Sequence, residues 1–255
     1  MKTAKKVDKK KHVSKHNLWL YGLHACIAAI ENPQRIVHQL LVTPNMLENL
    51  RGKGITDAVV ARCTQVSARE LESKLPPGAI HQGIAVRVDP LPAISLDEIL
   101  DGSPEAPLII LDQVNDPQNI GAILRSAAAF GAAAVLMTDR NAPLETAAMA
   151  KAASGALDIV PVVRLPNLAK ALEILKKHNY WCIGLDGHAQ DTIEKAFDFP
   201  RVAIVLGAEG KGLRRLTREL CDLLVKLPIN EKVESLNVSN AAAITLYALS
   251  QAHKP

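Results

Sequence analysis

The sequence has few aromatic residues and no long apolar run. Two Trp, three Tyr and three Phe are spread over 255 residues, too few for the RNA-binding modules that stack bases on a sheet. Charge, Gly or Pro interrupts every apolar stretch well before the roughly 18 residues that a membrane-spanning helix needs. The lysines at the N-terminus are not followed by the apolar segment of a secretory signal. We therefore expect a cytoplasmic protein with no membrane segment.

Cysteine pairs are also absent. Cys26, Cys63, Cys182 and Cys221 are scattered along the chain without a CxxC pair. This spacing argues against a disulfide framework and against structural zinc, and it fits a reducing compartment. We expect the four cysteines to act as small apolar residues, and we expect no metal.

Positive charge is concentrated at one end of the chain. Residues 1–17 carry seven Lys and one Asp, whereas the remainder is slightly acidic and the whole chain is +4. Such a block cannot be buried, and it would attract nucleic-acid phosphates without regard to sequence. The alternative is a solubilising, disordered leader.

The residues after this tail predict a small α/β domain over 18–90. Apolar spacing and turn signals predict a helix over 20–31, strands over 36–43, 58–63 and 84–88, and a helix over 67–75 opened by Ser67. Four prolines follow within residues 89–107. We take 91–106 as a linker with one helical turn at Ser95–Leu100.

The pattern from residue 107 onward predicts a second, larger α/β domain over 107–255. Its expected strands are 107–114, 133–139, 158–165, 180–186 and 201–209, and its expected helices are 119–131, 144–154 and 167–178. Strands that alternate with helices form a mainly parallel sheet covered on both faces. Ligands of such sheets bind in the loops at the carboxyl ends of the strands.

The first polar loop leads into the predicted helix 119–131. Asn119 stands where a helix cap is expected. The apolar residues of this helix share one face and place Arg125 on the opposite side. Arg125 therefore faces solvent, a ligand or another subunit, and a solvated arginine is the simplest reading of this position alone.

The second and third polar loops are rich in glycine and in small polar residues, respectively. Gly207, Gly210 and Gly212 follow an order that differs from the Rossmann and P-loop signatures. Glu209 among them is either a polar anchor or a loop charge, and the cations that follow either grip phosphate or solvate a helix. In the third loop, Ser235, Asn237 and Ser239 exceed what one helix cap requires, which indicates a ligand.

Three segments resemble ordered motifs of one family. These segments are NDPQNIGAILRSAAAFG (115–131), VLGAEGKGL (205–213) and LPINEKVESLNVSNAAA (227–243). They resemble the motifs of the SpoU/TrmH branch of the SPOUT superfamily. Members of this branch are RNA ribose 2′-O-methyltransferases that use S-adenosylmethionine. YGLHACIAAIE (21–31) and HQGIAV (81–86) are similar to the substrate-binding domain of the bacterial members that methylate a guanosine of 23S ribosomal RNA. The resemblance covers nearly all of the chain after the tail.

This resemblance implies a fold, a cofactor and partners. The expected fold is a C-terminal α/β trefoil-knot methyltransferase domain preceded by a small α/β RNA-binding domain. The expected cofactor is S-adenosyl-L-methionine, and the expected partners are RNA, in particular 23S ribosomal RNA, and a second copy of the chain in a homodimer. Periodicity alone gives no indication of a knot.

The family's functional positions fall on residues of these motifs. The catalytic positions are Asn119, Arg125, Glu209, Ser235 and Asn237. The positions that contact the methyl donor are Gly207, Gly212, Leu227, Ile229 and Leu236. Ile229, Asn230, Glu231 and Asn240 depart from residues common in the family, which affects the detail of the donor pocket and the choice of substrate more than the reaction type.

The reaction needs a ribose oxygen that is activated and held in line with the methyl group. A guanidinium stays protonated to above about pH 12, so we expect Arg125 to clamp phosphate and the developing alkoxide instead of removing a proton. Asn119 and Asn237 would orient the ribose or Arg125, and Glu209 would pair with the arginine. RNA recognition would use phosphate contacts and polar loops of the small domain, including Arg51 and Lys53.

Three alternatives remain open at this point. The chain is a methyltransferase of transfer RNA, a non-catalytic RNA-binding or ribosome-assembly protein, or a nucleotide-dependent enzyme that uses the glycine loop. The intact set of polar positions argues against the second alternative, and the order of the glycines argues against the third.

Overall fold

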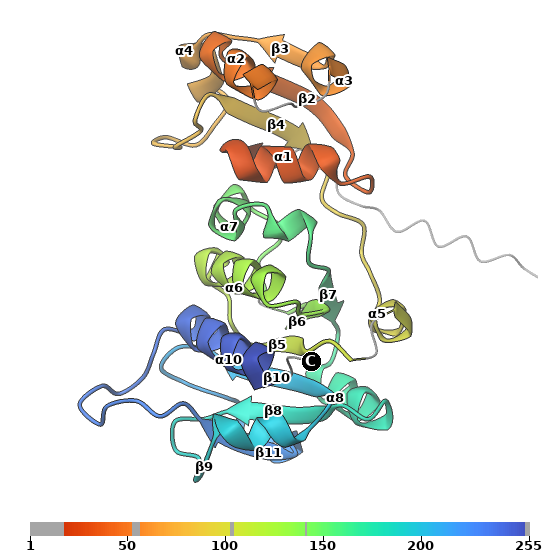
Figure 1. The fold of residues 1–255 in the computed structure, drawn as a ribbon, viewed down its shortest axis with the longest axis vertical. Helices are drawn as coiled ribbons and strands as arrows, with labels where there is room; N and C mark the ends of the chain where they lie inside the picture. The colour runs from red at the N-terminus through yellow and green to blue at the C-terminus, as the bar shows by residue number, and fades with distance from the viewer. Residues whose placement is uncertain (1–17, 53–56, 103–104, 141, 253–255) are drawn as a thin grey trace, which may run out of the picture.

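A computed structural model of the chain describes residues 18–52, 57–102, 105–140 and 142–252. The lysine-rich tail and Lys53 lie outside these ranges. The described residues form two sheets, one of four strands and one of seven, and Figure 1 shows the smaller sheet at one end of an elongated molecule. Within the described ranges, no helix is long and apolar enough to cross a membrane.

The smaller sheet has the strand order β1-β4-β2-β3. β4 pairs antiparallel with β1 and β2, whereas β2 and β3 are parallel. Its strands are β1 (Leu18–Tyr21), β2 (Val37–Val42), β3 (Cys63–Gln65) and β4 (Ile84–Val88), and its helices are α1 (Leu23–Glu31), α2 (Pro44–Gly52), α3 (Asp57–Ala61) and α4 (Ala68–Glu72).

Two predictions for this region are wrong in part. The predicted helix 20–31 is divided, because Gly22 adopts φ 86° and the residues before it pair with β4 as strand β1. The predicted strand 58–63 is mostly helix α3. A parallel β2–β3 pair needs a crossover connection, and α2 and α3 form that crossover before β3 begins at Cys63.

Other expectations for this region are confirmed. β2 and β4 occupy two of the predicted strand segments. Ser67 caps α4 in a reciprocal capping box with Glu70. The expected helical turn in the proline-rich segment is α5 (Leu96–Gly102).

The larger sheet has the order β7-β6-β5-β10-β8-β11-β9, and all its strand pairs are parallel. Its strands are β5 (Leu108–Asp112), β6 (Ala134–Thr138), β7 (Val162–Leu165), β8 (Trp181–Leu185), β9 (Asp191–Thr192), β10 (Val202–Gly207) and β11 (Leu223–Lys226). The helices are α6 (Pro117–Ala129), α7 (Ala147–Ala153), α8 (Leu168–Lys177), α9 (Arg215–Leu220) and α10 (Val238–Ala252), with 3₁₀ turns η1 (Ala156–Asp158) and η2 (Ile193–Asp198).

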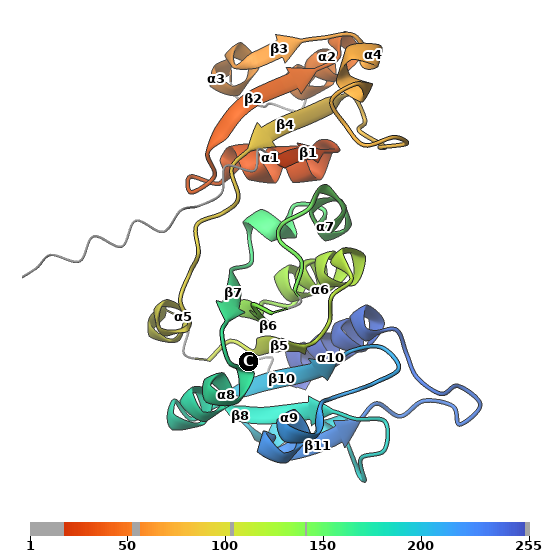
Figure 2. The same ribbon diagram turned by 180° about the vertical axis from the view of Figure 1, so that it is seen from behind.

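Both faces of the larger sheet are buried, as its continuous apolar strands predict. Ile109 and Leu111 of β5 pack in one hydrophobic cluster with α6, α7 and α10. Leu108 and Ile110 point to the other face and pack with α5 and α8. Figure 2 shows α8 and α9 on this second face. The arrangement is a three-layer α/β structure.

Some boundaries in this region differ from the prediction. The predicted strand 158–165 begins only at Val162, because Asp158 closes the 3₁₀ turn η1. The short strands β9 and β11 were not predicted, whereas helix α9 corresponds to one of the two alternatives for the cations after the glycine turn. β11 has only one fully buried residue, Val225, so its sequence lacks the apolar run that marks the inner strands.

Helix α7 connects the two halves of the molecule. It packs against α6 on one side and against β1 on the other, and Figure 1 shows it between α6 and α1. The Lys151 ammonium on α7 donates a hydrogen bond of 3.0 Å to the Ile80 carbonyl of the smaller half. The first hydrophobic cluster continues from α6 and α10 through α7 to β1 and β4.

Candidate active site

The first motif forms the loop after β5 and the start of α6. Asp116 is the N-cap of α6, and its carboxylate accepts hydrogen bonds from the amides of Gln118 and Asn119. Pro117 fills the first helical position, where no amide hydrogen is needed. The expectation that Asn119 caps this helix is therefore wrong, and its side chain is free for other contacts.

The second motif forms a tight turn at the carboxyl end of β10. The Gly212 amide donates a hydrogen bond of 2.8 Å to the Ala208 carbonyl. Gly210 and Gly212 adopt φ 72° and 63°, values that glycine tolerates best. A Cβ added at Gly207 would lie 2.1 Å from the Gly212 carbonyl carbon, so the crossing of the backbone at this point requires glycine. The turn holds Glu209 at its exposed tip.

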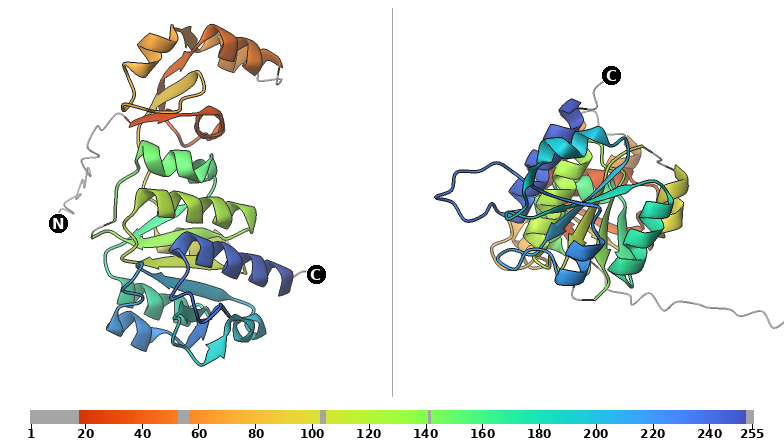
Figure 3. Two further views of the ribbon diagram at one scale, coloured as in Figure 1. Left: turned by 90° about the vertical axis from the view of Figure 1, so that its left-hand side faces the viewer. Right: turned by 90° about the horizontal axis from the view of Figure 1, so that it is seen from below.

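The third motif leads into α10. The Asn237 side-chain oxygen accepts hydrogen bonds from the Ser239 amide, at 2.9 Å, and from the Ser239 hydroxyl. Asn237 therefore caps α10. Its side-chain amide nitrogen remains available to donate, and it points back to the other two motifs. Figure 3 shows the long loop that precedes α10 standing out from the body of the molecule.

Asn119, Glu209 and Asn237 meet in one hydrogen-bonded group, here called the Asn–Glu–Asn cluster. The side-chain nitrogens of Asn119 and Asn237 donate to Glu209 Oε1 at 3.1 and 2.5 Å, respectively. The Asn237 Nδ2 also donates to Asn119 Oδ1 at 3.0 Å. The Val238 amide at the start of α10 adds a weaker hydrogen bond to the same Glu209 oxygen, at 3.4 Å. Three segments distant in sequence thus converge at the carboxyl edge of the sheet.

Arg125 and Ser235 stay outside this cluster. Arg125 is exposed on α6, opposite the buried Ile123 and Leu124, as predicted, and it forms no hydrogen bond or ion pair with the described residues. The expected pair between Arg125 and Glu209 is absent, because two amides and a helix N-terminus occupy the Glu209 oxygen instead. Ser235 is exposed in the loop before α10. The structure shows no bond that assigns a role to either residue.

A buried carboxylate near the cluster was missed. Asp112, at the end of β5, is fully buried and accepts hydrogen bonds from the Arg214 amide at 3.0 Å and from Arg214 Nε at 2.6 Å. It joins the strand to the segment after the glycine turn. Arg215 and Arg218 also pair with carboxylates, those of Glu219 and Asp186. The sequence signal for the Asp112–Arg214 pair was the single acidic residue that ends the apolar run LIILD (108–112).

The residues predicted to contact a methyl donor lie at the end of β10 and in the loops that follow β10 and β11 and precede α10. Gly207 ends β10 and Leu227 follows β11, both at the carboxyl edge of the sheet. Leu236 is half-buried directly before Asn237, and Ile229 is exposed. A Cβ at Gly210 or Gly212 would meet no atom within 4 Å.

Burial raises the pKa of all four cysteine thiols in this fold. Cys26 and Cys182 are buried, whereas Cys63 and Cys221 are half-buried. Burial raises the pKa of Cys182 and of Cys221 to about 12, which disfavours the reactive thiolate. Within the part of the chain that the structure describes, no three His, Cys, Asp or Glu side chains are grouped as metal ligands.

Comparison with known families and proteins places the chain in a family. The model of the SpoU rRNA methylase family matches residues 106–247, and the model for RNA 2′-O ribose methyltransferase substrate binding matches residues 19–93. The 23S rRNA (guanosine-2′-O-)-methyltransferase RlmB of Pasteurella multocida is 39% identical over 243 residues, which cover 90% of this chain and 96% of that protein. The protein of the same name from Vibrio vulnificus is 40% identical over 243 residues, which cover 91% and 95%.

Solved structures show the same fold. The SpoU methyltransferase AviRb from Streptomyces viridochromogenes, in complex with AdoMet, superposes with a TM-score of 0.74 at 24% identity, covering 92% of this chain and 89% of that one. The family models together span both halves of the molecule, and the SpoU rRNA methylase model contains all three motifs of the cluster. The chain therefore belongs to the SpoU rRNA methylase family of RNA 2′-O-methyltransferases.

Proposed function

We propose that this protein transfers the methyl group of S-adenosylmethionine to the 2′-oxygen of a guanosine in 23S ribosomal RNA. The Asn–Glu–Asn cluster carries the proposal, because it joins the three motifs at the edge of the sheet where ligands of parallel sheets bind. The choice of RNA and nucleotide is supported by the names of relatives 39–40% identical to this chain. Such a substrate fits a cytoplasmic location.

The methyl donor is proposed to lie beside the glycine turn. Backbone hydrogen-bonding groups and apolar side chains would surround it, contributed by Gly207, Gly212, Leu227, Ile229 and Leu236. When bound, S-adenosylmethionine supplies a methyl group made electrophilic by a positively charged sulfur. The Asn–Glu–Asn cluster fixes the glycine turn against α10 and so sets the position of this pocket.

Arg125 is the residue that we propose for activation of the ribose. Its charge is not neutralised by any described carboxylate, so it is available to an RNA phosphate and to the oxygen that gains negative charge during transfer. A positioned cation stabilises such charge without removing a proton. Asn119 and Asn237 would hold the ribose in line with the methyl group, and Ser235 would contribute a hydroxyl from the loop before α10.

We further propose the domain organisation and assembly that the family implies. Residues 18–90 form the RNA-binding domain, 91–106 the linker and 107–255 the catalytic domain, whose C-terminal segment forms the trefoil knot. The chain functions as a homodimer. Two large apolar side chains of α10 support this, since Ile244 and Tyr247 are 46% and 54% exposed on the face that points away from the core. Sedimentation of the purified protein tests the dimer.

The reaction is tested with the full chain and total RNA. Isothermal calorimetry with S-adenosylmethionine should show saturable binding, whereas ATP and NAD should not bind. Ribose methylation mapped across total RNA, with and without this protein, should differ at one guanosine of 23S ribosomal RNA. A difference confined to transfer RNA would mean that transfer RNA is the substrate. The absence of donor binding would overturn the enzymatic function.

The role of Arg125 has its own test. Arg125→Ala should lower the methylation rate by roughly 100-fold or more and leave donor affinity unchanged. Since Arg125 is exposed and unpaired, the variant should keep its stability within about 0.5 kcal/mol. Near wild-type methylation by this variant would show that the assigned role is wrong.

A further inference from the structure

A pocket of about 400 Å³ opens at the carboxyl edge of the larger sheet, beside the cluster but separate from it. Its volume lies in the range of sites that bind small molecules or single groups of a larger ligand. The pocket is lined by Gln113, Thr138, Arg140, Pro166, Asn167, Leu168, Ala169, Arg214, Leu216 and Thr217. None of the catalytic or donor-binding positions is among these residues.

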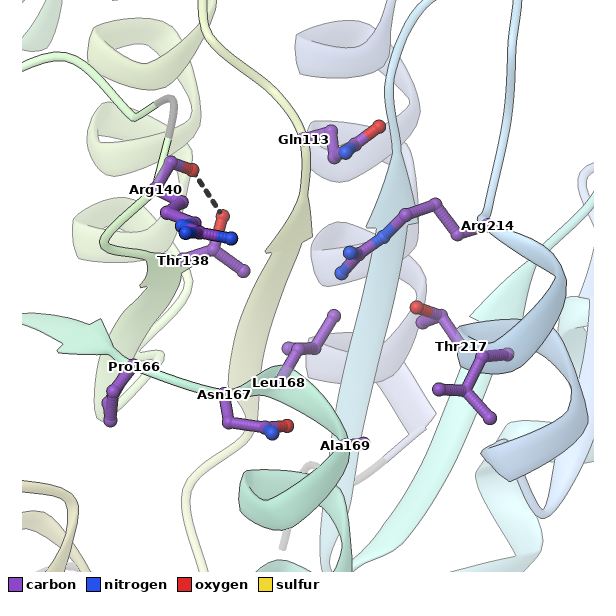
Figure 4. A pocket seen from close by; sticks show the side chains of 10 residues that line it. Gln113, Thr138, Arg140, Pro166, Asn167, Leu168, Ala169, Arg214 and Thr217 are labelled. Carbon is purple, nitrogen blue, oxygen red and sulfur yellow. Dashed lines mark hydrogen bonds between the residues drawn. The ribbon is translucent and has the colours of Figure 1, made fainter.

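Two arginines face each other across this pocket. Figure 4 shows Arg140, from the loop after β6, and Arg214, from the segment before α9, with their guanidinium groups directed toward each other from opposite walls. The lining contains no carboxylate. Buried Asp112 behind the wall pairs with Arg214, but the guanidinium of Arg140 has no partner among the described residues. An anion between the two arginines would relieve their repulsion and satisfy the free donors.

Further hydrogen-bond donors converge on the same space. Leu168 and Ala169, in the first turn of the ten-residue helix α8, line the pocket, and the first amides of a helix have no partner within the helix. The Asn167 side chain caps α8 through the Lys170 amide. Gln113 adds a side-chain amide to the lining, whereas the Thr138 hydroxyl donates its hydrogen to the Arg140 carbonyl at 3.1 Å. The combination of two guanidinium groups with neutral donors is suited to a phosphate group.

The walls of the pocket are continuous with the loops of the cluster. Gln113 begins the β5–α6 loop that ends at Asn119, and Arg214 follows the glycine turn that carries Glu209. A polymer whose ribose lies at the cluster would therefore pass close to this pocket.

We propose that this pocket binds a phosphate group of the RNA strand close to the methylated nucleotide, with Arg140 as its principal contact. This inference rests on the proposed function, because it takes the ligand to be the RNA substrate. Arg140 is then a specificity-determining residue that fixes the register of the strand, whereas Arg125 acts on the target ribose.

Arg140→Ala in the full chain tests the proposal, with Arg215→Ala as the matched control. Arg215 is an exposed arginine of the same face that pairs with Glu219 and does not line the pocket. Affinity for a 23S ribosomal RNA fragment is measured over a range of salt concentrations, separately from methylation. Arg140→Ala should weaken binding roughly tenfold and reduce the slope of log affinity against log salt by about one, while Arg215→Ala changes neither.

A second pair of variants separates charge from shape. Ala169→Glu places a carboxylate in the pocket at a helix position that favours acidic residues, and Ala169→Gln adds a neutral side chain of similar size. The glutamate should weaken RNA binding more than the glutamine does. Equal effects of both variants, or unchanged RNA affinity and salt slope in Arg140→Ala, would overturn the proposal.

Two more measurements identify the source of the anion. If Arg140→Ala weakened S-adenosylmethionine binding and left RNA binding intact, the pocket would hold the donor. If guanosine monophosphate or inorganic phosphate bound at micromolar concentration and lost affinity in Arg140→Ala while RNA affinity was unchanged, the ligand would be a free phosphate compound. Either result overturns the proposal. Wild-type protein that binds RNA with the expected Arg140 dependence, but no donor, would support the pocket and overturn only the proposed reaction.

Discussion

Arg35 of the smaller half and Asp158 of the larger half form a buried ion pair, with 2.7 Å between Arg35 Nε and Asp158 Oδ1. Arg35 Nη1 also pairs with Glu145 at 2.7 Å and donates to the Asp89 carbonyl. Burial alone would lower the pKa of Arg35, but the hydrogen bond to Asp158 and the charge of Glu145 outweigh it and raise the pKa. One arginine thus joins the segment before β2 to two acids around α7.

Replacing Arg35 should destabilise the molecule strongly. Arg35→Ala leaves two carboxylates without their cation in a buried interface, and breaking a buried pair in this way costs about 3–5 kcal/mol. Urea unfolding monitored by circular dichroism measures the loss. Arg215→Ala is the control, since its exposed pair with Glu219 should contribute less than about 1 kcal/mol. Similar stabilities for the two variants would contradict the role assigned to Arg35.

Gly121 should be essential for the contact of α6 with α7. A Cβ at this position would lie 2.4 Å from the Met149 carbonyl oxygen and 2.7 Å from the Ala152 Cβ. Gly121→Ala should therefore push the helices apart, cost roughly 1–3 kcal/mol and lower methylation by moving Asn119 and Arg125. The control variant Gly102→Ala adds a Cβ that meets no atom within 4 Å. It should leave the stability and the methylation rate unchanged. Thermal unfolding and initial rates distinguish these outcomes.

The Asn–Glu–Asn cluster should behave as one energetic unit. In a double-mutant cycle, Asn119→Ala and Glu209→Ala should show a coupling energy of about 0.5 kcal/mol or more, because each removes the partner of the other. Asn119 and Glu219 share no partner, so the changes in unfolding free energy caused by Asn119→Ala and Glu219→Ala should be additive. Unfolding by urea gives the stabilities. Strict additivity in the first cycle would mean that the observed hydrogen bonds do not stabilise the site.

Stability should decline at alkaline pH because of two thiols. Cys182 and Cys221 have an ordinary pKa of 9.0 when exposed and about 12 in the fold. Their contribution is complete below about pH 9. It falls by roughly 1.4 kcal/mol per pH unit for each thiol as the pH rises toward 12, because only the unfolded chain then releases the protons. Urea midpoints between pH 8 and pH 10.5 measure the decline. A Cys182→Ala/Cys221→Ala variant should show a shallower decline, and identical profiles would contradict the assignment.

The inner part of the larger sheet follows from sequence because burial is the same along each strand. β5, β6 and β10 are covered on both faces, so their residues form continuous apolar runs bounded by polar loops. The helical period of α6 likewise indicates its buried face and leaves Arg125 outside. The edge strands β9 and β11 are less buried, so they lack this signal.

The local details that failed depend on partners far away in the chain. α3 forms in place of a strand because the neighbouring β2–β3 pair is parallel, which no local pattern shows. Asp116, not Asn119, caps α6, although both residue types are good caps. The Asn119–Glu209 bond spans 90 positions, so its formation in place of an Arg125–Glu209 pair was not predictable from spacing. The buried Asp112–Arg214 pair has the same origin.

The cluster takes one side chain from each of positions 119, 209 and 237, and the last of these also starts α10. A growing polypeptide therefore has no complete cluster until residue 237 and the following helix have left the ribosomal exit tunnel. Synthesis and activity are therefore ordered in time, because a chain that ends before α10 lacks the side chain that completes the cluster and caps this helix.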